Sequence, residues 1–124
     1  MDASSSPYRV LVTGSRTWRG HGIIHHTLDQ LHAQHPDMVL VSGACNSGAD
    51  AIAERWAILR RVQTERHPAE WRRYGRSAGP RRNIAMVQTR PAEVVAFIRG
   101  QSAGASQCVR AAQAIGIPVR TWTQ

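Results

Sequence analysis

The sequence predicts an α/β protein whose doubly wound sheet of about five parallel strands lies between two layers of helices, in a three-layer sandwich. Two stretches support this prediction, because residues 10–14 and 39–43 are both apolar, β-branched runs that stop at a hydroxyl residue and a glycine. An amphipathic segment follows each run, so a strand precedes each tight turn and a helix follows it. The alternation continues along the chain, and right-handed crossovers between such units give a parallel sheet.

The individual elements follow from apolar periodicity and from turn residues. We expect strands at residues 8–13, 38–42, 61–67, 93–98 and 117–122, the third being the weakest. Helices are expected at residues 22–34, after Gly48, from Pro80 to about residue 89, and after Ser106, with Gly116 as a C-terminal cap. Residues 69–79 are expected to form a loop. The apolar helix faces are expected to comprise Ile24, Leu28 and Leu31, then Ala49, Ile52, Ala53, Trp56 and Leu59, and finally Cys108, Ala112 and Ile115.

Length and composition indicate one domain. A chain of 124 residues, 42% of them hydrophobic, can form one core, and we assign it to residues 8–124 after a disordered tail at 1–7. The polar start has no secretory pattern, and no run reaches the roughly 18 apolar residues of a membrane span, so we predict a cytoplasmic protein without a membrane partner. Cys45 and Cys108 are expected in separate loop regions as reduced thiols.

Positive charge is concentrated in one part of the chain. The formal net charge is +8, lysine is absent, and half of the arginines lie between Arg60 and Arg82. A genome rich in arginine codons explains the missing lysine, and a solvated surface explains many such clusters. Clustered arginines also create a positive electrostatic field, which would attract a small phosphorylated ligand or a nucleic acid. Three interpretations of the cluster therefore remain open at this point: a solvated surface, a site for a small anionic ligand and a surface for nucleic acid.

Four small-residue loops follow strands or open helices, at residues 14–16, 42–50, 79–83 and 100–106. The carboxyl ends of parallel strands meet at one edge of a sheet, where α/β proteins bind ligands. The Gly-x-Gly-x-x-Gly dinucleotide pattern is absent, and no lysine exists for a P-loop, which disfavours a standard NAD or P-loop site. The loops therefore predict a phosphate site of another kind.

Five ordered motifs resemble the YspA or cpYpsA-related branch of the SLOG superfamily. They are Gly-Ser-Arg, Ser-Gly-Ala-Cys-x-x-Gly-Ala-Asp, Glu-Arg-His-Pro-Ala-x-Trp, Ala-Gly-Pro-Arg-Arg-Asn-x-x-Met and Gly-x-Ser-x-Gly, at residues 14–16, 42–50, 65–71, 78–86 and 100–104. The resemblance covers nearly everything from Tyr8 to Val119.

The resemblance implies a Rossmann-like domain that binds nucleotides or nucleotide-derived ligands. The superfamily includes cytokinin-activating phosphoribohydrolases, sensors of ADP-ribose-type signals and the DNA-processing protein DprA, and this branch occurs in phage, plasmid and defence contexts. We therefore expect a nucleotide-binding or ADP-ribose-binding protein that acts as a sensor or regulator, and no cofactor is assigned. Members are often dimers, so the resemblance also implies a homodimer, and a DprA-like nucleic-acid binder stays an alternative.

One motif departs from the phosphoribohydrolase pattern. Where those enzymes resemble Pro-Gly-Gly-x-Gly-Thr-x-x-Glu, this chain has Ala105 in place of the threonine and Cys108 in place of the glutamate. A thiol does not readily replace a carboxylate as a general acid or base near neutral pH. Binding is thus expected to be retained, while a hydrolase of N-glycosidic or phosphate bonds stays an alternative, with Asp50 and Arg82 as its catalytic candidates.

We predict roles for the loop residues from their chemistry. Backbone N–H groups would hold phosphate at Ser15, Arg16, Gly48, Ala49, Gly104, Ala105 and Ser106, with the Arg16 and Arg82 side chains adding charge. Asp50 would accept from a ribose hydroxyl or favour a helix N-terminus. Asn83 would read a base or cap its helix. Trp71 and Tyr74 would stack on a base, or Trp71 would anchor its loop. The full predicted ligand set is Gly14, Ser15, Arg16, Ser42, Gly43, Gly48, Ala49, Asp50, Arg82, Asn83, Ser102, Gly104, Ala105 and Ser106.

The first predicted helix is rich in histidine. His21, His25 and His32 can share one face at spacings that permit metal ligation. No clear carboxylate accompanies them, and histidines on a surface helix are usually solvated, so we predict no metal site.

Overall fold

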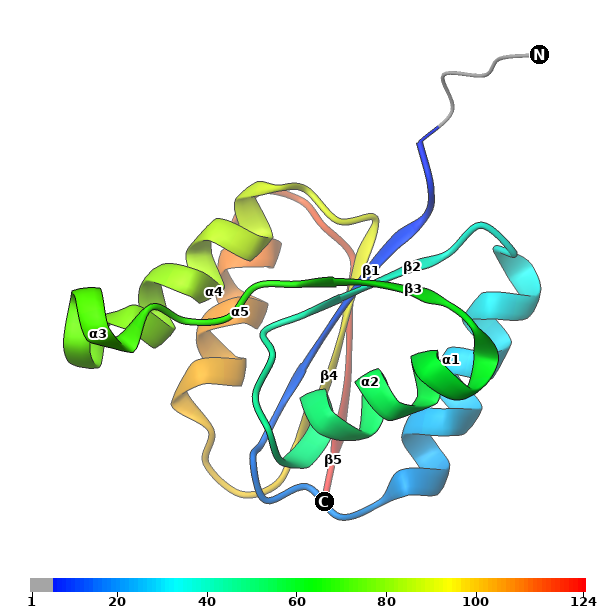
Figure 1. Ribbon diagram of the computed structural model, residues 1–124, viewed down its shortest axis with the longest axis horizontal. Helices are drawn as coiled ribbons and strands as arrows, with labels where there is room; N and C mark the ends of the chain where they lie inside the picture. Colours follow the sequence, from blue (N-terminus) through cyan, green and yellow to red (C-terminus); the bar gives the residue numbers. More distant parts are fainter. Residues whose placement is uncertain (1–5) are drawn as a thin grey trace.

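The computed structural model describes residues 6–124 and contains a five-stranded, all-parallel sheet, which confirms the predicted fold class. Residues 1–5 of the predicted disordered tail lie outside the described residues. The strands are β1 (Arg9–Gly14), β2 (Val39–Ser42), β3 (Gln63–Arg66), β4 (Glu93–Ile98) and β5 (Val119–Thr123), in the order β3-β2-β1-β4-β5. The chain runs outward from the central β1 to one edge of the sheet and returns to build the other (Figure 1).

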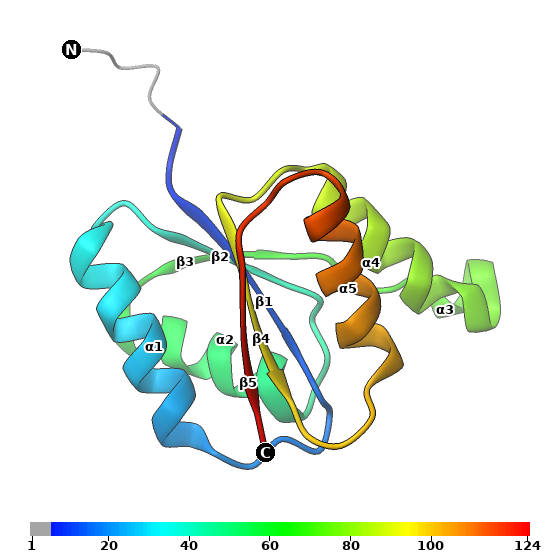
Figure 2. The same ribbon diagram turned by 180° about the vertical axis from the view of Figure 1, so that it is seen from behind.

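Helices cover both faces of the sheet, as Figures 1 and 2 show from opposite sides. Helices α1 (His21–Gln34) and α2 (Gly48–Arg60) pack on one face, and α4 (Ala78–Gln88) and α5 (Ala103–Ala114) pack on the other. Alternate side chains of β1 enter the two layers: Val10 and Val12 join the α1 and α2 side, whereas Leu11 joins the α4 and α5 side. Both faces of the central strands β1, β2 and β4 are thereby buried, as is usual for parallel sheets, whereas the edge strands β3 and β5 stay partly exposed.

Two residues of the predicted helix faces are exposed instead of buried. Leu59 is 62% exposed and Ile115 is 38% exposed. The buried face of α2 is centred on Ala53 and Trp56, and near its end Ala57 takes the inward position, so Leu59 turns outward. Ile115 follows the last residue of α5 with a non-helical backbone, which removes its side chain from the helix face.

The predicted loop at residues 69–79 was wrong over most of its length. A short helix, α3 (Trp71–Tyr74), and a 3-10 turn (Gly75–Ser77) occupy it, and α4 begins at Ala78. Pro80 is therefore the third residue of α4 and not its first. A proline is tolerated there because the N–H groups of a helix's first turn have no partner inside the helix. Cys108, also expected in a loop region, is buried in α5.

Candidate functional site

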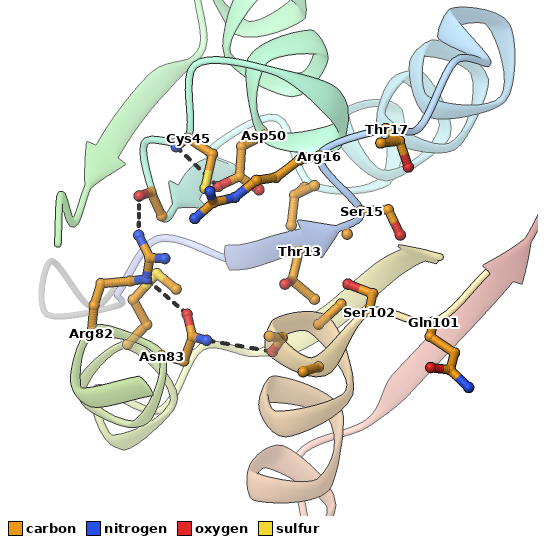
Figure 3. A pocket seen from close by; sticks show the side chains of 17 residues that line it. Thr13, Ser15, Arg16, Thr17, Cys45, Asp50, Arg82, Asn83, Gln101 and Ser102 are labelled. Carbon is orange, nitrogen blue, oxygen red and sulfur yellow. Dashed lines mark hydrogen bonds between the residues drawn. The ribbon is translucent and has the colours of Figure 1, made fainter. Parts of the chain in front are cut away.

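A cleft of about 370 Å³ opens at the carboxyl edge of the sheet, between the ends of β1 and β2, the first turns of α2 and α5, and the middle of α4 (Figure 3). This volume lies within the range of small-molecule sites, which is about 300–1,000 Å³. The cleft brings together residues from all four predicted loops. The predicted ligand residues that line it are Gly14, Ser15, Arg16, Gly43, Asp50, Arg82, Asn83, Ser102, Gly104 and Ala105.

The floor of the cleft is fixed by the turn after β1. The Ser15 N–H donates to the Phe97 carbonyl oxygen at 2.9 Å, and the Ser15 hydroxyl accepts from the Arg99 N–H at 2.8 Å. A Cβ at Gly14 would lie 2.3 Å from the Phe97 carbonyl oxygen, so only glycine fits. The Ser15 N–H, predicted as a phosphate donor, is therefore already paired within the fold.

Four predicted ligand residues do not line the cleft. Ala49 donates its N–H to the Ser15 carbonyl oxygen at 3.2 Å, and a Cβ at Gly48 would lie 2.1 Å from that same oxygen. The Ser106 N–H donates to the Ser102 carbonyl oxygen at 3.0 Å, and the buried Ser42 hydroxyl donates to Glu54 at 2.6 Å. The polar groups of Ser42, Ala49 and Ser106 therefore have partners inside the protein, and Gly48 lies close against the turn after β1.

Arg82 and Asn83 connect α4 to the β2–α2 loop and to the start of α5 (Figure 3). Arg82 donates through Nη1 to the Gly43 carbonyl oxygen and through Nε to Asn83 Oδ1 at 2.7 Å. Asn83 in turn donates to Gln107 Oε1 at 3.1 Å and to the Gly104 carbonyl oxygen at 3.4 Å. The side chains of α4 thus fix the β2–α2 loop and the start of α5 relative to each other.

Asp50 is a buried carboxyl group on the wall of the cleft. It is 6% exposed, and its Oδ2 accepts from the Cys45 N–H at 3.3 Å. Burial raises the pKa of Asp50 to about 6, against the opposing effects of the Cys45 N–H and the Arg82 charge. A carboxyl group with such a pKa exchanges its proton close to neutral pH, which suits acid–base chemistry.

The first turn of α5 presents free hydrogen-bond donors to the cleft. Ser102 precedes this turn without a side-chain capping bond. Among the described residues, the N–H groups of Ala103, Gly104 and Ala105 have no acceptor, and neither does the guanidinium of Arg16. Figure 3 shows the Arg16 side chain extending beside Asp50 and Cys45. A helix N-terminus and a guanidinium that line the same cleft are suited to binding an anion.

Sequence reasoning missed several residues of the cleft. Thr13, Thr17, Cys45, Gln101 and Ala103 line it, with the apolar Val12 and Met86. All lie within two residues of a predicted site residue except Met86, which occurs in the fourth motif. Cys108, by contrast, is fully buried in the core between α5 and the sheet, and burial raises the pKa of its thiol to about 11.

The structure also bears on the histidine-rich helix, the arginine cluster and the question of a membrane span. Within residues 6–124, no group of three or more histidine, cysteine or acidic side chains is placed to hold a metal ion. Three of the eight arginines between Arg60 and Arg82 pair with a carboxylate: Arg60 with Asp29 at 2.9 Å, Arg66 with Glu54 at 3.2 Å and Arg73 with Glu70 at 3.7 Å. No helix in the described part of the chain is long and apolar enough to cross a membrane.

Comparison with known proteins gives two matches. A family model described as the YspA, cpYpsA-related SLOG family matches residues 8–74. The Gene 61 protein of Mycobacterium phage D29 is 43% identical over 117 residues, which span 90% of this chain and 93% of the phage protein. No solved structure matches significantly. The family match confirms the family that the motifs suggested, and its span of residues 8–74 includes the first three of the five. The phage protein agrees with a phage context.

Proposed function

The chain belongs to the YspA, cpYpsA-related SLOG family, and from this membership and the cleft we propose that it binds a nucleotide or an ADP-ribose-like derivative as a sensor or regulator. The setting we propose is that of a phage, plasmid or defence system, since the Gene 61 protein of a mycobacteriophage is similar over nearly its whole length.

One observation supports this proposal most strongly. The uncapped first turn of α5 and the exposed guanidinium of Arg16 line the same cleft, and in residues 6–124 neither has an acceptor. Such donors are stabilised by an anion that accepts from several of them at once, as a phosphate does. A phosphate or diphosphate at this position would accept from the Gly104 and Ala105 N–H groups and from Arg16.

The other cleft residues would position the rest of the ligand. Asp50 faces the cleft from α2 and would accept from a ribose hydroxyl. Arg82 contributes positive charge while its hydrogen bonds to Gly43 and Asn83 keep the loops in place. We propose that Gly14 and Gly43 contact the ligand through their backbone, because neither has room for a side chain: a Cβ at each would lie within 3 Å of a neighbouring atom.

The test is the substitution Gly104→Asp, followed by calorimetric titration with AMP and ADP-ribose. Position 104 has room for a side chain, since the nearest atom to a Cβ there is Asn83 Nδ2 at 3.5 Å. An aspartate in the first turn favours the helix, so the fold is retained. Its negative charge would lie where the phosphate binds, and we expect at least tenfold weaker binding, about 1.4 kcal/mol.

The matched control is Gly104→Asn, which has nearly the same shape without the charge. We expect it to bind more tightly than the aspartate variant. Equal affinity of the parent protein and the Gly104→Asp variant would show that the phosphate does not bind at α5. If the parent protein binds neither ligand, the proposed function is wrong.

Hydrolysis is a second candidate function, and the raised pKa of Asp50 favours it. A carboxyl group with a pKa of about 6 can donate or accept a proton during cleavage of an N-glycosidic or phosphate bond, with Arg82 stabilising developing negative charge. Release of free base or phosphate from a nucleotide panel, lost in Asp50→Asn, would support this activity. The buried Cys108 has no part in it.

A further inference from the structure

Within residues 6–124, Trp71 is the one Trp, Tyr or Phe residue whose ring has no aromatic or cationic partner. Of the seven Trp, Tyr and Phe residues in the chain, the other six all make such a contact. Trp71 is 50% exposed, whereas Trp18, Trp56 and Phe97 are buried. An exposed indole without a partner has a free π surface.

Tyr74, the other aromatic residue of α3, differs in this respect. The guanidinium carbon of Arg81 lies 4.3 Å from the centre of its ring, and that of Arg73 lies 5.0 Å away. These cation–π contacts already cover the tyrosine ring. The structure therefore separates the two aromatic residues that the sequence named as candidates for stacking on a base.

The position of the indole is set by α4. A Cβ at Gly79 would lie 3.2 Å from Trp71 Cη2, so the absence of a side chain at 79 lets the ring approach the helix closely. This contact holds one end of the ring while half of the side chain stays exposed. A ring held in this way loses little conformational freedom when a ligand binds, which favours affinity.

Trp71 also borders the cleft. It lines a hollow of about 420 Å³ between α3 and the β2–α2 loop, and this hollow shares Arg16, Gly43, Cys45 and Arg82 with the cleft. A ligand with its phosphate at Arg16 and α5 and its sugar at Asp50 would continue into this hollow, because Cys45, which hydrogen-bonds Asp50 through its N–H, lines both spaces.

We infer that the hollow beside Trp71 is the nucleobase subsite of the cleft, with the base stacked on the indole. The inference rests on the proposed function and makes it more specific: the ligand carries a base, and a sugar phosphate alone fills only part of the site. Base–aromatic stacking contributes enough to decide affinity, since its loss on alanine substitution weakens binding by about 5- to 150-fold per base. Asn46 places an exposed amide at the same hollow, where it can contact the base edge.

The experiment compares two ligands, AMP and ribose 5-phosphate, which differ only by the base. We expect Trp71→Ala to weaken AMP binding by about 5- to 150-fold and to leave ribose 5-phosphate binding unchanged. Trp71→Phe keeps an aromatic ring and should retain most of the AMP affinity. Tyr74→Ala is the matched control on the same helix, and it should bind both ligands as the parent does.

Three results would overturn the inference in distinguishable ways. If Trp71→Ala weakens both ligands equally, the indole only anchors the segment. If it weakens neither, the base lies elsewhere, and the proposed nucleotide binding stands without this subsite. If the parent protein binds neither ligand, nor ADP-ribose, the proposed function itself fails and the subsite with it.

Discussion

Replacement of Asp50 by asparagine should stabilise the protein, and by an amount that grows with pH. The folded pKa is about 6, against an ordinary value of 3.8. Each pKa unit corresponds to about 1.36 kcal/mol, so ionising this buried carboxyl group costs the fold about 3 kcal/mol. Asparagine has nearly the same shape, keeps an oxygen that can accept from the Cys45 N–H, and never ionises.

Whether stability rises or falls with pH depends on whether the folded or the unfolded state binds the Asp50 proton more tightly. Because the folded pKa is raised, protonation favours the folded state, and the parent protein loses stability as pH rises from about 3.8 to about 6. Above about pH 6 the parent protein carries the full free-energy cost of the ionised Asp50. The stability difference between Asp50→Asn and the parent should therefore be less than about 1 kcal/mol at pH 4 and approach about 3 kcal/mol at pH 8.

Urea unfolding of both proteins at several pH values measures this difference. Asp29→Asn is the matched control, because the hydrogen bond from Arg60 lowers the pKa of Asp29. The parent gains stability from that group as pH rises, so the control variant should become relatively less stable with rising pH. If the difference between Asp50→Asn and the parent were the same at pH 4 and pH 8, burial of the carboxylate would not be the cause.

Two further predictions concern packing and thiol chemistry. Gly14→Ala should destabilise the protein by about 1–3 kcal/mol or more in urea unfolding, because its Cβ would lie 2.3 Å from the Phe97 carbonyl oxygen. Gly22→Ala, with nothing within 4 Å, should instead stabilise by up to about 1 kcal/mol, and a similar loss in both variants would contradict the steric argument. Iodoacetamide should modify the half-buried Cys45 before the fully buried Cys108, and peptide mass spectrometry that finds Cys108 modified first would contradict the packing of α5.

Most of the fold could be predicted from local pattern. The apolar runs at residues 10–14 and 39–43 became β1 and β2, and the turns after them reached the same edge of the sheet. These predictions succeeded because strand and helix periodicities are properties of neighbouring residues. The prediction of a loop around Trp71 was wrong, because a helix of four residues is too short to produce a periodic pattern of apolar residues.

The sequence predicted which loops meet at the cleft, but it did not predict which of their N–H groups are free to bind a ligand. Loops that carry small residues, Asp50 and Arg82 do meet in one cleft. Sequence reasoning could not tell which N–H groups would be free, because the partners of Ser15 and Ala49 come from distant parts of the chain. Ser15 donates to Phe97, which follows it by more than eighty residues.

By itself, the sequence determined the order of strands and helices, the turns that end them and the family, since each depends on residues read in order along the chain. Only the tertiary structure decided the burial of Asp50, the pairing of Ser15 and Ala49, the free donors of α5 and the uncovered ring of Trp71. Burial and hydrogen-bond satisfaction depend on which distant groups the fold brings within contact, and a free donor or a free aromatic ring is what remains after those contacts are made.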